Sequence, residues 1–267
     1  YLSWSSLVLS LGMSATLNIQ IRCNMLRMGI QRITEFIDSR PVFMMLHGKS
    51  VIRFTNYSDL VERANPILVS INAFYIIERD VLAPMGLNLD MIGMYFPPQW
   101  NVSTAEITEF LGRDDDNLLV VPHGTDMMRD CQNNLTEYSD KIEIVEGPNI
   151  VGGGGPNSMT ALIHSLIGAG ARELVLFGAD GCHTSTPNDQ EYNTYIGGNE
   201  ILARRLTKAS LAGDVQRMNR LTGAYVEASR QLFGVRDRVL IMNCSPGSHF
   251  TCYKDVTYDE LMYRYKP

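Results

Sequence analysis

The sequence has no excess of basic residues and no long apolar run. Lysine and arginine together number 23, against 29 aspartates and glutamates, and the formal net charge is −6. A protein that binds nucleic acid usually presents a basic face, so this balance argues against a nucleic-acid partner. A membrane span needs roughly 20 apolar residues in a row, so the sequence predicts no transmembrane segment. Peripheral membrane contact and assembly into a homo-oligomer stay open.

The five cysteines include no C-x-x-C pair. An odd count in a chain of this length is typical of reduced thiols, which predicts a cytoplasmic protein. Cys182, His183, Cys244, His249 and Cys252 have spacings that fit no standard zinc-ligand pattern, so we expect no metal site. The first residues lack an initiator methionine and a basic n-region, which indicates a fragment of a longer chain rather than a signal peptide.

Short, continuous apolar runs alternate with helical patterns along the chain. The first run, Val42–Leu46, is bounded by Pro41 and Gly48. Such a run is typical of a strand buried on both faces, as parallel strands are. Strands that alternate with helices predict an α/β fold with a mostly parallel sheet flanked by helices. The further predicted strands lie in residues 66–72, 89–96, 117–124, 141–146, 173–180 and 238–245.

The same patterns divide the chain into four parts. Residues 1–40 carry apolar side chains at helical spacing and predict an N-terminal helical segment. Residues 41–185 form the predicted α/β core, with the candidate ligand-binding strand ends. Residues 186–238 are expected to form a lid-like loop followed by helices. Residues 239–267 supply a closing strand and the C-terminal segment of the core.

Polar residues follow several of the predicted strands, where ligands of parallel sheets bind. Gly48 and Ser50 stand in the turn "HGKS", which is not a G-x-x-x-x-G-K-[ST] phosphate loop. Asn72 follows the second strand, and Asp180 ends the segment "ELVLFGAD". Because the carboxyl ends of parallel strands share one edge, we expect these residues to lie together there.

The segment "GGGGPNSM" precedes a strongly apolar helical pattern. Glycine loses more backbone freedom on folding than other residues, so four in succession are costly to order. One interpretation is that the bare backbone of Gly154 and Gly155 approaches a phosphate at the helix N-terminus. The other is a slack connector in which Asn157 or Ser158 merely caps the helix.

The segment after Asp180 carries further candidates. His183 suits a general base, since the pKa of histidine lies near neutrality, and a loop histidine bonded to Asp180 is the alternative. Tyr192 and Tyr195 lie in the polar stretch "QEYNTYIGGN". Their hydroxyls could donate to phosphate oxygens from a lid, or the stretch could be an exposed connector.

The order of these pieces resembles the family 42 sialyltransferases, the motility accessory factors and the archaeal pterin diphosphokinase-like proteins. The resemblance covers roughly residues 42–255 and rests on "HGKSV", "SINAFYI", "GARELVLFGAD" and "NCSPGSHF". It implies a Rossmann-like transferase that binds a nucleotide-activated sugar. CMP-sugars are the favoured donors, and no metal is obligatory. The implied nucleotide-holding residues are Gly48, Ser50, Asn72 and Ser158, and those for the leaving phosphate are Tyr192 and Tyr195.

One departure concerns the base. The sialyltransferases have a lid histidine where "TYIGG" of this chain offers Thr194. His183 is therefore our first candidate for the base, with Asp180 orienting its ring. His249 is the second candidate, because the resemblance places its "SPGS" turn near the same cleft.

Three functions follow from these observations. The leading one is a glycosyltransferase that moves a sugar from a nucleotide to a glycan or a small hydroxyl acceptor. The second is transfer of diphosphate from ATP to a pterin-type alcohol, which would need Mg²⁺ held by carboxylates such as Asp180 or Asp114–Asp116. The third is a non-catalytic nucleotide-binding protein, favoured by the missing lid histidine.

Overall fold

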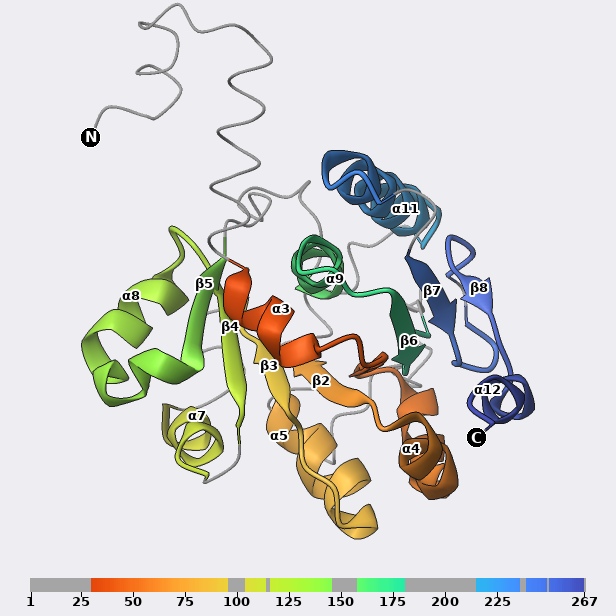
Figure 1. Cartoon of the computed structure of the whole chain (residues 1–267), viewed down its shortest axis with the longest axis horizontal. Coiled ribbons are helices and arrows are strands. Elements are labelled where there is room, and N and C mark those ends of the chain that lie inside the picture. Colours follow the sequence, from red (N-terminus) through yellow and green to blue (C-terminus); the bar gives the residue numbers. More distant parts are fainter. Residues whose placement is uncertain are drawn as a thin grey trace, which may run out of the picture.

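Parallel strands build a single sheet, and helices cover both of its faces (Figure 1). The strand order is β5-β4-β3-β2-β1-β6-β7-β8, and every neighbouring pair is parallel. This is a Rossmann-like α/β fold, as the sequence predicts. The computed structural model describes residues 30–95, 104–113, 116–145, 158–180, 215–235, 239–248 and 250–266.

Each of the seven apolar runs contains a strand, so these predictions are confirmed. In β1 and β2 every residue is buried, because helices exclude water from both faces of the sheet. The strand β8 has only two residues, both charged and exposed, and nothing in its sequence predicts it. The strands are β1 (Val42–Met45), β2 (Ile67–Ile71), β3 (Met91–Gly93), β4 (Leu118–Pro122), β5 (Ile142–Val145), β6 (Glu173–Phe177), β7 (Leu240–Asn243) and β8 (Lys254–Asp255).

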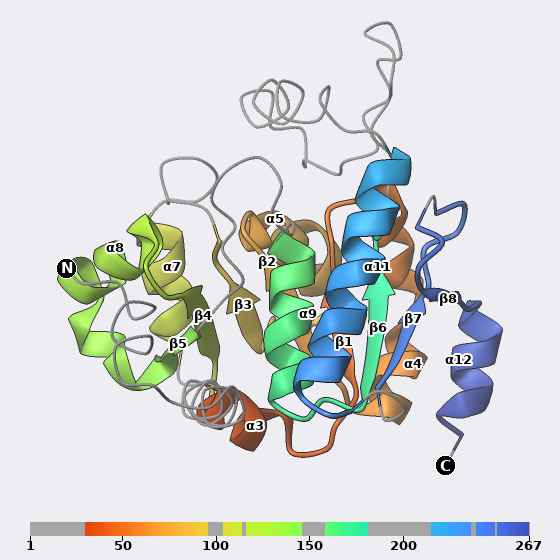
Figure 2. The same ribbon diagram turned by 90° about the horizontal axis from the view of Figure 1, so that it is seen from above.

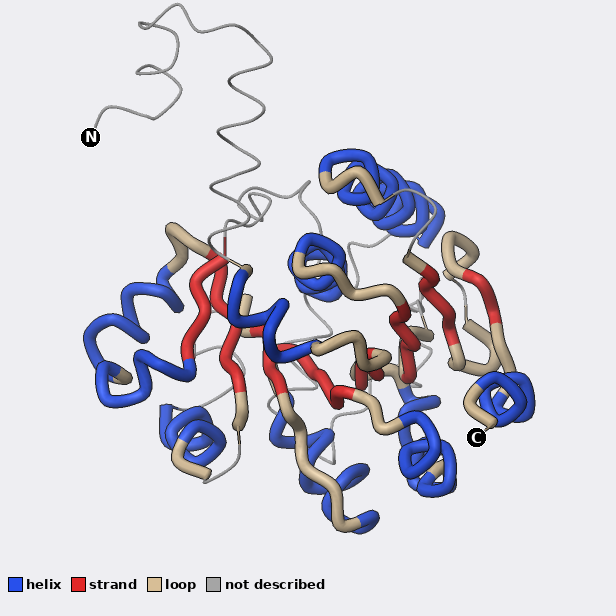
Figure 3. Tube along the Cα trace, in the orientation of Figure 1, coloured by secondary structure: helices blue, strands red, loops and turns tan. Residues whose placement is uncertain are grey.

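The helices form two layers, one on each face of the sheet (Figures 2 and 3). The side chains of α3, α9 and α11 belong to the hydrophobic core on one face, and those of α4, α5, α7, α8 and α12 to the core on the other. The first layer consists of α3 (Gln31–Ile37), α9 (Ser158–Gly168) and α11 (Val215–Leu232). The second consists of α4 (Ser58–Ala64), α5 (Phe74–Ile77), α7 (Thr104–Leu111), α8 (Asp126–Asn134) and α12 (Tyr258–Arg264).

Shorter helical turns fill the connections. The 3₁₀ helix η1 (Lys49–Asn56) begins directly after Gly48, in the turn that follows β1. The π-helix η2 (Glu78–Leu82) and the 3₁₀ turn η3 (Ala83–Met85) continue α5. A further 3₁₀ segment, η4 (Thr136–Lys141), leads into β5.

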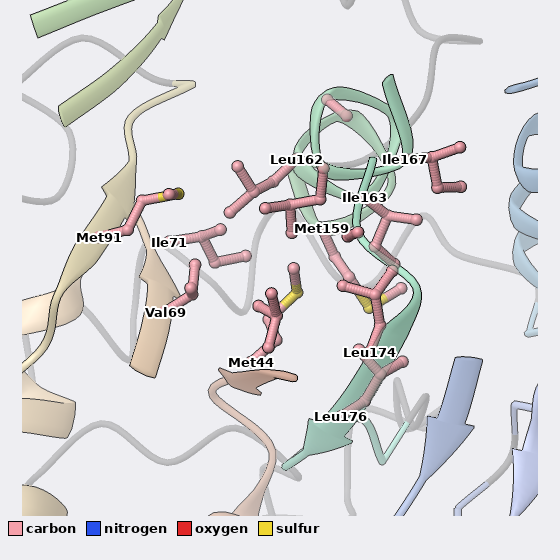
Figure 4. Close-up of a cluster of buried hydrophobic side chains, with 14 of the residues drawn as sticks. Met44, Val69, Ile71, Met91, Met159, Leu162, Ile163, Ile167, Leu174 and Leu176 are labelled. Carbon is pink, nitrogen blue, oxygen red and sulfur yellow. The ribbon is translucent and has the colours of Figure 1, made fainter. Parts of the chain in front are cut away.

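Helix α9 is the central element of its layer. Its residues from Ser158 to Ile167 are all buried, since the sheet lies beneath it and α11 lies beside it. Figure 4 shows side chains of this helix, among them Leu162, facing Met44 and Leu174 of the sheet. A helix that is apolar on all sides is typical of such a position. Burial of α9 thereby holds Ser158 at one edge of the sheet.

The predicted N-terminal segment is described only from residue 30 onward. There α3 buries Ile33 and Ile37 in the core. The predicted lid residues up to 214 lie outside the described residues. The closing strand β7 pairs with β6 and so belongs to the same sheet as the core.

The order in which strands are added to the sheet reverses at β1. From β1 the strands proceed outward through β2, β3 and β4 to β5, and the chain then returns to place β6 on the other side of β1. In open parallel sheets, ligands bind at the carboxyl ends of the strands where such a reversal occurs. The boundary between β1 and β6 is therefore the expected position of a site.

Candidate functional site

The turn after β1 and the loop after β6 meet at this boundary. The backbone N–H of Gly48 donates to the carbonyl of Gly178 at 2.8 Å. The backbone N–H of Ser50 donates to Oδ2 of Asp180 at 2.9 Å, and the Ser50 hydroxyl donates to Oδ1 of the same carboxylate. A residue 130 positions further along the chain thus closes the turn.

Gly48 is required here for space. Its φ of −69° is open to any residue. A Cβ at this position would lie 2.3 Å from the carbonyl oxygen of Gly178 and 2.5 Å from Cγ of Asp180. Both distances are far below van der Waals contact, so only glycine lets Asp180 lie against the turn. The contact explains the glycine of "HGKS" without any ligand.

Asn72 joins three elements at the end of β2. Its Nδ2 donates to Oγ of Ser158 at 3.0 Å, and its Oδ1 accepts the backbone N–H of Tyr95 at 3.1 Å. These bonds connect β2 with the start of α9 and with the residues after β3. Asn72 is buried and has a positive φ of 47°, a conformation that asparagine adopts more readily than most residues. Such backbone strain is concentrated at functional sites.

Helix α9 begins at Ser158, at the same edge of the sheet. The first N–H groups of a helix lack intrahelical partners and carry partial positive charge, so an anion is favoured there. The N-cap position falls on Asn157, which lies outside the described residues, as do Gly154 and Gly155. Phosphate binding by the glycine loop therefore stays a prediction.

The turn after β7 is anchored to Ala179, the residue before Asp180. The Ser245 hydroxyl accepts the N–H of Ala179 at 2.8 Å. The Ala179 carbonyl accepts from the Ser248 hydroxyl at 2.6 Å and from Nδ2 of Asn243 at 3.3 Å. We did not predict these residues from their own chemistry. The resemblance of "NCSPGSHF" to a family turn was the one signal that pointed to them.

His47 lies between the Asn72 and Asp180 contacts. Its Nε2 is 3.2 Å from the carbonyl oxygen of Ala73. A carbonyl can only accept, so Nε2 donates and the neutral ring keeps an acceptor at Nδ1. Burial lowers the pKa of His47, opposed by the bond to Ala73, so the ring is neutral at physiological pH.

Of the other described histidines, His164 lies away from this edge, whereas His123 lies on it but three strands from β1. His164 is buried between α9 and α11, where its Nδ1 is 2.7 Å from the Ser229 hydroxyl. Burial lowers the pKa of His164 to about 4. His123 is exposed after β4.

Several candidates cannot be placed in the described part of the chain. For these the sequence-based predictions stand as they are. They are His183, His249, Tyr192, Tyr195, Gly154, Gly155 and Asn157.

The carboxylates suggested for Mg²⁺ binding do not come together where the structure describes them. Asp180 follows β6 at the carboxyl edge, whereas Asp116 precedes β4 at the amino edge. Asp116 there lines a cleft of about 440 Å³ with Glu35, Asp38 and other residues. Within the described ranges, no group of three histidine, cysteine, aspartate or glutamate side chains could hold a metal ion.

Comparison of the chain with protein-family models, with curated proteins and with solved structures finds no match. Among the described helices, none is long and apolar enough to cross a membrane. The function is therefore inferred from the residues at the carboxyl edge and from the motifs in the sequence.

Proposed function

We propose that the protein is a cytoplasmic glycosyltransferase that uses a nucleotide-activated sugar, with a CMP-sugar as the favoured donor. One observation carries the proposal. At the reversal of strand order, the Ser50–Asp180 hydrogen bond joins the turn after β1 to the loop after β6. The Asn72–Ser158 hydrogen bond joins the end of β2 to the start of α9. Nucleotides bind to α/β sheets at such a position. The motif order that resembles the family 42 sialyltransferases supports the choice of donor.

The phosphate of the donor is best accommodated at the N-terminus of α9. Both donors of Ser50 go to the Asp180 carboxylate, whose negative charge disfavours a phosphate at the turn after β1. The start of α9 carries the positive end of the helix dipole. In the proposed complex, the loop amides around Gly154 and Gly155 extend this anion site.

The proposed reaction needs a base and stabilisation of the leaving group. A base removes the proton of the acceptor hydroxyl as its oxygen attacks the anomeric carbon, and the bond from that carbon to the phosphate oxygen breaks. His183 or His249 supplies the base, while Tyr192 and Tyr195 donate to the departing phosphate. Donors aimed at developing charge contribute strongly to such catalysis.

A ligand panel tests nucleotide binding directly. Thermal unfolding is measured with CMP, CDP, UDP, GDP and ATP, each with and without Mg²⁺. A ligand at 100 times its dissociation constant stabilises the folded state by about 2.7 kcal/mol, so binding is readily detected. We expect stabilisation by CMP without Mg²⁺. Stabilisation by ATP only with Mg²⁺ would instead favour diphosphate transfer.

Turnover of a CMP-sugar separates a transferase from a non-catalytic nucleotide-binding protein. His183→Ala and His249→Ala are measured for turnover and for CMP affinity. Loss of a general base should reduce turnover by roughly 10²–10⁴-fold while affinity is largely kept. Normal turnover in both variants contradicts a base at either position. CMP binding without turnover of any donor by the unaltered protein favours the non-catalytic function, which the threonine in "TYIGG" suggests.

A further inference from the structure

The carboxylate of Asp180 is held in place with half of its acceptor capacity in use. An ionised carboxylate offers about four acceptor sites on two oxygens. Within the described ranges, its hydrogen-bond donors are the N–H and the hydroxyl of Ser50, one to each oxygen. Among the described residues, each oxygen therefore keeps a free acceptor site. Asp180 is partly exposed, so a ligand can reach it from solvent.

The surroundings fix the orientation of this carboxylate. Gly48 brings the backbone against Cγ of Asp180, and Ser50 holds both oxygens. The preceding residue, Ala179, is bonded through its N–H and its carbonyl to Ser245 and Ser248. A group constrained from both sides is preorganised for a ligand, because little freedom is lost when the ligand binds.

The remaining acceptors suit a neutral donor pair. A second anion is repelled by the charge, so this position excludes phosphate. Two hydroxyls on adjacent carbons present two O–H donors at a spacing that matches two carboxylate oxygens, in the way that bidentate pairs match. Hydrogen bonds to a charged acceptor are the stronger class.

The position of Asp180 relative to the start of α9 also fits a nucleotide. Asn72 links the start of α9 to the end of β2, whereas Asp180 follows β6, with β1 between them. Neighbouring strands are about 4.8 Å apart, so the two positions are separated by about 10 Å. A nucleoside monophosphate with one hydrogen bond at each end spans a comparable length.

We propose that Asp180 binds a vicinal diol, the ribose 2′- and 3′-hydroxyls of the nucleotide, through the two oxygens that Ser50 holds in place. This inference rests on the proposed function. It assigns the ribose to the boundary between β1 and β6 and the phosphate to the N-terminus of α9.

Calorimetric titration with CMP and with 2′,3′-dideoxy-CMP tests the assignment. For the unaltered protein we expect dideoxy-CMP to bind about 10–100-fold more weakly than CMP, as expected for loss of hydrogen bonds to a charged group. In Asp180→Asn the ratio of the two dissociation constants, dideoxy-CMP over CMP, should fall below about threefold. In Asp255→Asn, which alters an exposed carboxylate at the far end of the same edge, the ratio should stay as in the unaltered protein.

The possible results separate this inference from the proposed function. If no nucleotide of the panel binds, the proposed function fails and the inference fails with it. If CMP binds but dideoxy-CMP binds equally well to the unaltered protein, the inference alone is overturned, even if Asp180→Asn does not fold. An unchanged ratio in folded Asp180→Asn also overturns it. The acceptor sugar is the other possible source of a diol, and a titration with lactose tests it. If lactose binding depends on Asp180 while CMP and dideoxy-CMP bind equally well, the carboxylate binds the acceptor, and the inference is overturned.

Discussion

The two edges of the sheet are held together by different chemistry. At the carboxyl edge, short side chains such as Asn72 and Ser50 bond to residues of other loops. At the amino edge, long cationic side chains bond to backbone carbonyls. Lys141 donates to the carbonyls of Leu111 and Arg113 at 2.9 and 2.7 Å, where α7 ends.

Helix direction explains the difference. The connecting helices run opposite to the strands, so their N-termini gather at the carboxyl edge and their C-termini at the amino edge. Unpaired carbonyls at helix C-termini attract cations, whereas unpaired N–H groups at N-termini attract anions and acceptors. The amino edge satisfies its carbonyls with the protein's own side chains. The carboxyl edge carries both the N-terminus of α9 and the Asp180 carboxylate, to which we assign the phosphate and the ribose of the proposed nucleotide. This comparison predicts that amino-edge changes affect stability alone, whereas carboxyl-edge changes also affect binding.

The largest expected effect is at Gly48. Gly48→Ala places a Cβ against the carbonyl of Gly178 and Cγ of Asp180 and should lower the free energy of unfolding by about 3 kcal/mol or more. The control, Gly170→Ala at the amino edge, meets open space and has only its φ of 90° to oppose it. We expect a cost of about 1 kcal/mol there. If urea unfolding shows the same loss of stability for Gly48→Ala and Gly170→Ala, the close packing around Gly48 is contradicted.

The pH dependence of stability tests the helical layer of α9 and α11, which lies between the two edges. The pKa of His164 is about 4 in the folded protein, below the unfolded value near 6.5. The unfolded chain therefore takes up the proton first, and stability present above pH 6.5 is lost as the pH falls towards 4. The loss attributable to this group is about 3 kcal/mol.

The measurement is urea unfolding at pH 7.5 and 4.5. His164→Gln should show a smaller decrease between the two pH values than the unaltered protein, since glutamine does not titrate. Identical decreases in both proteins would show that another group causes the acid sensitivity.

At the amino edge, Glu78→Gln should cost about 2 kcal/mol of stability. Glu78 is buried, accepts the N–H of Leu89 at 2.9 Å, and pairs with both terminal nitrogens of Arg113 at 2.6 and 2.7 Å. Glutamine keeps the shape but removes the negative charge that Glu78 places against the guanidinium. The affinity for CMP should stay within twofold. A large loss of affinity would break the proposed separation between the two edges.

At the carboxyl edge, Asn72→Ala should cost about 1–2 kcal/mol of stability, less than Glu78→Gln, because only neutral hydrogen bonds are lost. It should nevertheless weaken CMP binding by about tenfold, since the start of α9 loses its link to β2. Calorimetric titration and urea unfolding give the two values. Reduced stability with unchanged affinity would show that Asn72 is purely structural.

Much of the fold could be predicted from the sequence because parallel strands are buried on both faces. That burial demands continuous apolar runs, which are visible locally in β1 and β6. Elements without such a requirement were missed. Helix α8 is short and polar and depends on the Thr125 cap, whose side chain accepts the N–H of Met128. Strand β8 consists of two exposed charged residues and forms only because β7 lies beside it.

The sequence by itself determined which residues stand at strand ends, and so it pointed to Gly48, Asn72 and Asp180. Only the tertiary structure decided that Ser50 bonds Asp180 across 130 positions and that Asn72 bonds Ser158 across 86. These pairings depend on the strand order, in which β6 returns to the side of β1. Local patterns carry the period of each element. The order of strands depends on which apolar faces pack together over the whole chain, and that information lies in no single segment.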